Sequence, residues 1–312
     1  MIRISFTELL SIAHRSLFLI SKNIYILYLG IISIIFSTVL SIFQFINPPS
    51  ATIPHKFITK GLSSGSLILM KWIFYLLNFI KHLSSGGLII FIIAIVVYII
   101  VSIYFTIAAS STIIKTLADN KNWEHKGNFR EYWKNGIKSW VNYFIYSLLF
   151  GIIFTIVFFI FLLIAVSLIN INSLFLIVAL IIGIILLVFL FTIAYIGLRL
   201  VLIENMDIID AFRFSFSLVK NNFSLFINIT LFYIITLLVL YLFSSIIESI
   251  ILSVVRSLSV FINISFIYSL SLIGFIIMLF ILGVLAVYSS AFWTGVFLFL
   301  RDEKKLFKIS HT

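Results

Sequence analysis

Six apolar runs follow one another along the chain. Each is long enough for a helix that crosses the hydrocarbon core of a bilayer, which takes about 20 residues. The runs are residues 24–46, 87–111, 141–169, 174–203, 223–244 and 262–300. Only Asn170-Ile171-Asn172-Ser173 separates the third run from the fourth, which predicts a helical hairpin. The pattern therefore predicts an all-α fold: a polytopic transmembrane helical bundle of about six spans.

Three short segments have a different pattern, with apolar and polar residues on opposite faces at helical spacing. The first covers residues 6–22 and precedes span one. The second begins Asn128-Phe129-Arg130-Glu131, the spacing of a helix capping box, and precedes span three. The third begins at Asp207 and precedes span five. We expect each of them to form a short amphipathic helix at the membrane interface.

These segments align with one another without gaps. Ala13-His14-Arg15 corresponds to Ala211-Phe212-Arg213, and Lys22-Asn23 corresponds to Lys220-Asn221, while Lys134 takes the place of Arg15. One interpretation is a threefold repeat of a short helix and a helical hairpin within a single membrane domain, residues 1–312. Its units would be residues 1–112, 127–203 and 205–300, with an outer insertion at 47–86. The other interpretation is that all helices beside a membrane share such basic, aromatic features.

Two further stretches lie between the predicted spans. All three prolines fall at residues 48–54, so residues 47–65 are predicted to be an extended loop. Residues 66–82 carry one narrow polar stripe, which favours a helix lying in the outer interface; a seventh span is the alternative. Polar residues between Ser245 and Arg256 also keep helical phase, which predicts another outer surface helix before the last span.

The charge is distributed unevenly about these spans. The chain is 63% hydrophobic and 10% charged, with a net charge of +11. In the six-span topology 16 Lys and Arg residues, Arg199 among them, lie on one side and 5 on the other. The positive-inside rule then places both termini in the cytoplasm. Abundant Ile, Phe and Asn beside few Ala and Gly indicate an AT-rich bacterial genome, hence a bacterial cytoplasmic (inner) membrane.

The basic residues do not form runs with interleaved aromatic residues, so nucleic acid is not the predicted partner. Positive charge beside apolar spans is instead explained by attraction to anionic lipid headgroups. Other membrane proteins are a second class of partner. The candidate contacts with anionic lipid or partners are the cations of the three amphipathic segments: Arg15, Lys22, Arg130, Lys134, Lys138, Arg213 and Lys220.

Several kinds of chemistry have no signature in the sequence. There is no cysteine, the five histidines are scattered singly, and no phosphate-binding loop or nucleophile elbow is present. With these boundaries, no ionisable residue is expected deep inside a span, which is where proton relays and ion paths place them. We therefore predict no catalytic residue, no metal site, no cofactor and no enzymatic activity.

Residues around the fourth and fifth spans resemble a known family. They are Arg199-Leu200-Val201-Leu202-Ile203-Glu204, Asp210-Ala211-Phe212-Arg213-Phe214-Ser215 and Lys220-Asn221-Asn222-Phe223. This pattern is similar to the membrane domain of glycerophosphoryl diester phosphodiesterases and to related six-span bacterial proteins. In those enzymes the chemistry belongs to an attached soluble barrel. Only twelve residues follow Leu300 here, so the resemblance implies a membrane module without that barrel.

Two functions follow as hypotheses. The first is a non-enzymatic inner-membrane protein that organises or assists membrane lipids or partner proteins. The alternative is a transporter or exporter of a hydrophobic or lipid-like solute, which does not require charged spans.

Overall fold

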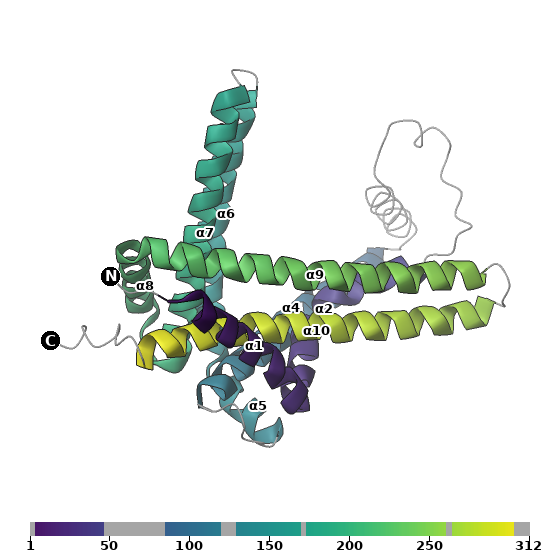
Figure 1. Cartoon of the computed structure of the whole chain (residues 1–312). Helices are drawn as coiled ribbons and strands as arrows, with labels where there is room; N and C mark the ends of the chain where they lie inside the picture. The colour runs from purple at the N-terminus through teal and green to yellow at the C-terminus, as the bar shows by residue number, and fades with distance from the viewer. Residues whose placement is uncertain (1–3, 47–84, 120–128, 170–172, 260–263, 303–312) are drawn as a thin grey trace. The chain divides into compact units, whose positions relative to one another are not determined.

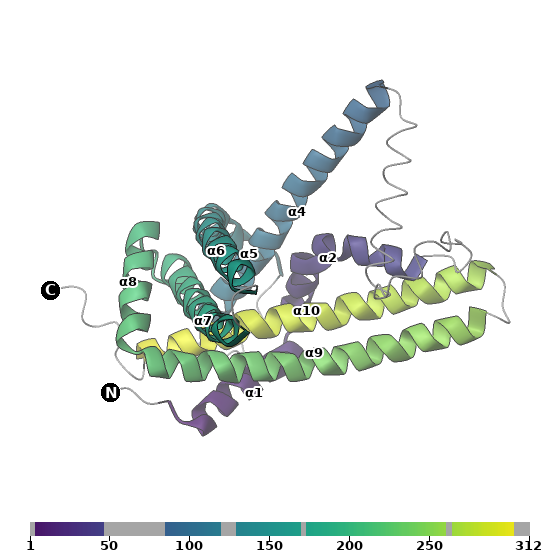
Figure 2. The same cartoon turned by 90° about the horizontal axis from the view of Figure 1, so that it is seen from above.

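The computed structural model describes residues 4–46, 85–119, 129–169, 173–259 and 264–302 (Figure 1 and, turned by 90°, Figure 2). Over these ranges every regular element is an α-helix. Three helices are short: α1 (Phe6–Lys22), α5 (Phe129–Ile137) and α8 (Ile208–Asn221). The long helices are α2 (Ile24–Ile46), α4 (Ser85–Asp119), α6 (Trp140–Ile169), α7 (Ser173–Ile203), α9 (Phe223–Ser259) and α10 (Ile264–Asp302). The predicted polytopic helical bundle is confirmed.

Five of the described helices are long and apolar enough to cross a membrane: α4, α6, α7, α9 and α10. Residues Phe6–Ile20 of α1 and Ile24–Ile35 of α2 meet the same criteria only together, as a pair bent by 92°, so the number of candidate spans among the described residues is six if this pair counts as one. The chain is thus a multi-pass membrane protein. Helix α10 has 39 residues, and at about 1.5 Å per residue it exceeds a hydrocarbon core of about 30 Å. Such a helix tilts or protrudes from the bilayer.

Each short helix leads directly into a long one. Asn23 separates α1 from α2; its backbone N–H donates to Leu19 O (3.0 Å) and its side-chain oxygen accepts from Tyr25 N (3.2 Å). Asn222 likewise ends α8, with its N–H donating to Leu218 O (3.1 Å). The third of these connections, each called an elbow below, is Lys138-Ser139, between α5 and α6. Among the described helices the order is therefore short, long, long three times, while descent from one repeated unit stays a prediction.

Helix α1 begins with a capping box that the sequence analysis did not identify. The Ser5 hydroxyl accepts from Glu8 N (3.2 Å), and Glu8 Oε2 accepts from Ser5 N (2.6 Å). These bonds satisfy backbone donors that a helix N-terminus leaves unpaired. The capping box predicted at Asn128, the loop at 47–65 and the outer segment at 66–82 lie outside the described residues.

The predicted separate surface helix between Ser245 and Arg256 is wrong. This stretch continues α9, which runs without a break from Phe223 to Ser259. No glycine or proline interrupts residues 223–259, and polar residues that keep helical phase fit a continuing helix as well as a new one.

The described residues divide into two compact units. Unit 1 contains Met1–Ile34, Thr106–Ile246 and Phe280–Thr312, and unit 2 contains Ile35–Phe105 and Ile247–Leu279. The main core lies in unit 1 and includes Tyr146, Ile196, Phe226 and Trp293, from α6, α7, α9 and α10. In unit 2, Phe275 and Leu279 of α10 form a small cluster with Ile35 of α2.

Burial changes along the long helices. In α7, most large apolar side chains from Phe175 to Leu186 are exposed, whereas Ile193 to Leu202 lie in the core. Helix α4 has the same gradient, exposed over Ile89–Ile103 and buried around Ile113. Lipid tails solvate apolar side chains, so exposure of such residues on spans is expected. The packed part of unit 1 is therefore formed by the helix halves that the charge distribution assigns to the cytoplasmic side.

In unit 1, α5 docks on α4 through a glycine. A Cβ on Gly136 would lie 2.5 Å from both Cα and Cβ of Thr112, and Ser111 Oγ donates to Gly136 O (3.0 Å). We predict that Gly136→Ala separates the two helices, because the obstacle is backbone and does not move aside. Overpacking of this kind costs about 1–3 kcal/mol. The expected result is a lower apparent melting temperature of the purified protein in detergent.

Gly151→Ala is the matched control. No atom lies within 4 Å of a Cβ built on Gly151, which is an exposed position of α6. Alanine favours a helix over glycine by up to ~1 kcal/mol, so this variant should melt at the same temperature as the parent or higher. Equal melting of the two variants would contradict the tight α4–α5 contact.

Candidate functional site

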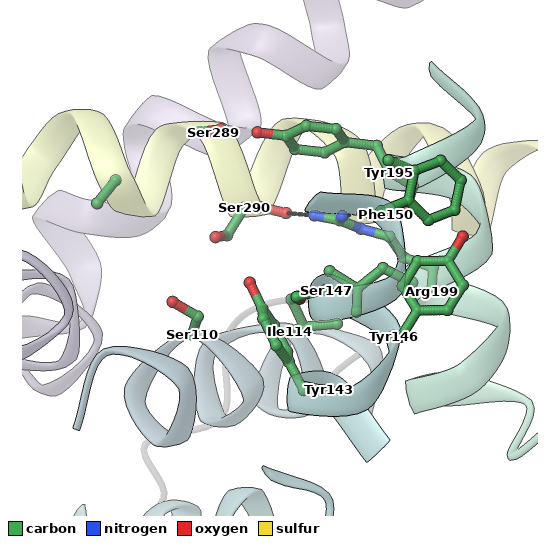
Figure 3. A pocket seen from close by; sticks show the side chains of 13 residues that line it. Ser110, Ile114, Tyr143, Tyr146, Ser147, Phe150, Tyr195, Arg199, Ser289 and Ser290 are labelled. Carbon is green, nitrogen blue, oxygen red and sulfur yellow. Dashed lines mark hydrogen bonds between the residues drawn. The ribbon is translucent and has the colours of Figure 1, made fainter. Parts of the chain in front are cut away.

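A cavity of about 360 Å³ opens between helices of unit 1 (Figure 3). Its walls come from four elements: Ser110 of α4, Tyr143 and Ser147 of α6, Arg199 of α7 and Ser290 of α10 all line it. Helix α6 reaches the cavity in its first three turns and α7 in its last three. The cavity thus lies where the packed ends of these four helices meet.

Arg199 is the charged residue of this cavity. Its side chain is only 1% exposed. Nη1 donates to the carbonyl oxygen of Tyr195 (3.1 Å) and Nη2 to that of Ser290 (3.2 Å), the bond drawn in Figure 3. Nε is buried and has no hydrogen-bond partner in the part of the chain that the structure describes. A guanidinium has five N–H donors, so three of them lack an acceptor among these residues.

No carboxylate of the described ranges neutralises Arg199. The described residues place no Asp or Glu within ion-pair distance of its guanidinium, although Arg301 of α10 pairs with Glu204, the residue after α7 (3.1 Å). An isolated charge taken out of water carries a large desolvation penalty, and buried charges are normally paired. The guanidinium therefore retains both unmatched donors and an unmatched positive charge.

An aromatic wall supports the arginine. The Tyr195 ring centroid lies 5.1 Å from Arg199 Cζ, a cation–π contact, and 5.1 Å from the ring centroid of Trp293. Behind it, the Tyr233 and Ser289 hydroxyls form a hydrogen bond of 2.6 Å. These interlocked side chains hold the guanidinium in place.

Tyr146 forms part of the opposite wall. It is 1% exposed, and its hydroxyl donates to Ile193 O (3.3 Å). The hydroxyl lies so close to Gly197 that a Cβ there would collide with it. The absence of a side chain at Gly197 thus lets α6 and α7 approach each other beside Arg199.

The seven cations predicted as contact sites lie elsewhere in unit 1. Arg15 and Lys22 are on α1, Arg130 and Lys134 on α5, Lys138 in the following elbow, and Arg213 and Lys220 on α8; all seven are exposed. The Lys22 ammonium lies over the Phe18 ring, 4.8 Å from its centroid. None of the seven lines the cavity. They form a solvent-facing set that is distinct from the pocket.

Arg199 is one of the 16 cations counted on one membrane side, and the count did not identify it as a buried residue. Arg199 lies within α7, which ends four residues later at Ile203, and its side chain turns inward against α10. A count of charges per side does not distinguish an inward position from an outward one. One available signal is the helical spacing of Arg199 with Tyr195, Ile196 and Thr192, three residues that also pack inside the bundle.

The described residues contain no group of three or more His, Asp or Glu side chains arranged to hold a metal ion. The cavity is lined by apolar side chains, Ile114, Phe150 and Leu198 among them, and its polar lining consists of hydroxyl groups and one guanidinium. Such groups bind and orient an anion.

We predict that Arg199→Met leaves the ligand-free protein at least as stable as the parent. Both carbonyl acceptors keep other donors, because Ser290 O also accepts from Thr294 Oγ1 (2.7 Å) and Tyr195 O remains in its helix. Replacing a buried charge with an apolar side chain of similar size is often neutral or stabilising. The measurement is the apparent melting temperature in phosphate-free detergent solution.

Ile196→Ala on the same helix is the control. Ile196 is fully buried, and its truncation should destabilise the bundle by about 2–5 kcal/mol. If the melting temperature of Arg199→Met falls as far as that of Ile196→Ala, the role of Arg199 is to stabilise the fold and not to bind a ligand.

Comparisons with family models, with curated proteins and with solved structures gave no match to this chain.

Proposed function

We propose that this chain is a non-enzymatic integral membrane protein that gathers anionic lipids around its short amphipathic helices and so organises the surrounding membrane. The chain would reside in a bacterial cytoplasmic membrane with both termini inside the cell. The resemblance to the membrane domain of glycerophosphoryl diester phosphodiesterases agrees with a membrane module.

The observation that carries this proposal is the placement of α1, α5 and α8. Each helix packs apolar residues into unit 1, through Leu9 and Ala13 of α1, Trp133 of α5 and Ala211 of α8. Each leaves its cations exposed. A helix with one packed face and one cationic face is suited to the headgroup region of a membrane.

Bulky apolar side chains accompany the exposed cations. On α1, Phe6 is 67% exposed and Leu10 53%; on α8, Ile209 is 62% exposed. Exposed apolar groups of this size mark an interaction surface. Apolar side chains that reach the acyl region beside cations at headgroup level are the combination by which interfacial helices bind anionic membranes.

Charge removal tests the proposal. A well-placed Lys or Arg contributes about 1 kcal/mol of attraction to an anionic leaflet. The triple variant Arg15→Gln/Lys134→Gln/Arg213→Gln removes one cation from each short helix. We expect the anionic fraction of co-purifying lipid to fall toward that of the bulk membrane, measured by mass spectrometry of native lipid particles.

The matched control is Lys56→Gln/Lys60→Gln/Lys71→Gln. It removes the same charge from the segment predicted to lie on the outer side, where anionic lipid attraction is not expected to depend on it. Unchanged lipid composition in the first variant, or an equal change in both, would refute the proposal.

A second candidate function is favoured by the cavity. Its position among helices of unit 1 suits a transporter or exporter of a lipid-like solute. We expect such a protein to move solute in proteoliposomes and to show alternating labelling of cysteines introduced one at a time at Ser110 and Ser290. The chain has no native cysteine, so labelling reports these positions directly. A static labelling pattern without flux would exclude this candidate.

A further inference from the structure

We infer that the Arg199 cavity is a specific binding site for one phosphate-type oxyanion. This site goes beyond the proposed function, because it is buried, takes a single ligand and uses none of the seven exposed cations. Its shared ligand chemistry is a phosphoryl group, carried either by a lipid headgroup or by a soluble phosphate.

The charge balance of the cavity requires an anion. Arg199 is 1% exposed, has no carboxylate partner among the described residues and keeps an unpartnered Nε. Its two bonds go to neutral backbone carbonyls, and Tyr195 contributes only the face of a neutral ring. A bound anion would neutralise the guanidinium and accept from its remaining donors, as arginine does with phosphate and carboxylate.

The other groups of the cavity favour a tetrahedral oxyanion over a planar carboxylate. Hydroxyls of Ser110, Tyr143 and Ser147 line the cavity from α4 and α6, while Arg199 reaches it from α7. In Figure 3 the Tyr143 hydroxyl points toward the space beside the guanidinium. Donors on several walls match the oxygens of a phosphoryl group, which point in several directions, better than the two coplanar oxygens of a carboxylate.

The size and depth of the cavity fit a headgroup. Ligand pockets range over about 300–1,000 Å³, so 360 Å³ admits a phosphate and part of its substituent but not two acyl chains. Arg199 precedes the end of α7 by four residues, about 6 Å of helix. A site at that depth is reached from the headgroup layer as well as from solution.

The test uses full-length protein in maltoside micelles, which contain no phosphate. Short-chain phosphatidic acid, short-chain phosphatidylglycerol, inorganic phosphate and dodecanoate are titrated separately, with calorimetry for stoichiometry and ³¹P NMR for the bound phosphoryl group. We expect one equivalent of a phosphoryl ligand to bind, with dodecanoate binding weakly or not at all. Tighter binding of a short-chain lipid would identify a lipid headgroup as the carrier of the phosphoryl group, and tighter binding of inorganic phosphate would identify a soluble phosphate.

Variants locate the ligand. Hydrogen bonds to charged groups contribute enough that Arg199→Gln should bind at least about tenfold more weakly. Arg199→Lys keeps the charge without the planar fork, so its affinity for the phosphoryl ligand should lie between that of the parent and that of Arg199→Gln. If Arg199→Gln does not fold, the double variant Ser110→Ala/Tyr143→Phe keeps the arginine and should bind several-fold more weakly.

Three results would overturn the inference. These are phosphoryl binding unchanged in folded Arg199→Gln or in Ser110→Ala/Tyr143→Phe, preference for dodecanoate, and binding of several equivalents that disappears in Arg15→Gln/Lys134→Gln/Arg213→Gln. The last result would support the surface proposal alone. Conversely, normal single-site binding in that triple variant, combined with unchanged lipid recovery, would retain the pocket and refute the proposed function.

Discussion

Helices in a bilayer are not driven together by the hydrophobic effect, because lipid tails solvate apolar side chains as well as a protein interior does. This bundle therefore depends on close approach of helices where side chains are small. A Cβ on Gly30 of α2 would lie 2.5 Å from the carbonyl oxygen of Gly283 on α10, and Gly136 approaches Thr112 equally closely. The short helices dock on this same packed part of unit 1. Close packing at one end thus positions both the exposed cations and the Arg199 cavity.

Much of the fold follows from hydropathy and capping. The predicted bounds of α1 and α2 are those observed, because the polar phase of residues 6–22 changes at Asn23 to an unbroken apolar run. The start of α8 after Asp207 is found for the same reason. The end of α9 is missed, since Ser245 and Ser249 interrupt the apolar run without breaking the helix. Hydropathy identifies where side chains suit lipid, whereas backbone hydrogen bonding decides where a helix stops.

The exposed cations could be predicted from the sequence, whereas the burial of Arg199 could not. The exposure of Arg213 and Lys220 agrees with the amphipathic phase of their helix. The burial of Arg199 depends on contacts across the bundle: Ser290 is 91 residues away along the chain, and Tyr143 belongs to another helix. In a nearly uniformly apolar helix such as α7 hydropathy does not show which face packs inward, and the spacing of Arg199 with Thr192 and Tyr195 is the one sequence signal for that face. Tertiary contacts decide the orientation.

The buried and exposed cations have different energetic consequences. An exposed cation such as Arg15 remains hydrated when no lipid is bound, so it attracts anionic headgroups without discriminating among them. Arg199 loses its hydration on burial, and its unmatched donors favour only ligands that replace water in a fixed geometry. A carboxylate at position 195 or 290 would neutralise it within the fold, as Glu204 does for Arg301, but the chain has Tyr195 and Ser290 there. Within the described residues no carboxylate takes this role for Arg199, which agrees with the inferred oxyanion ligand.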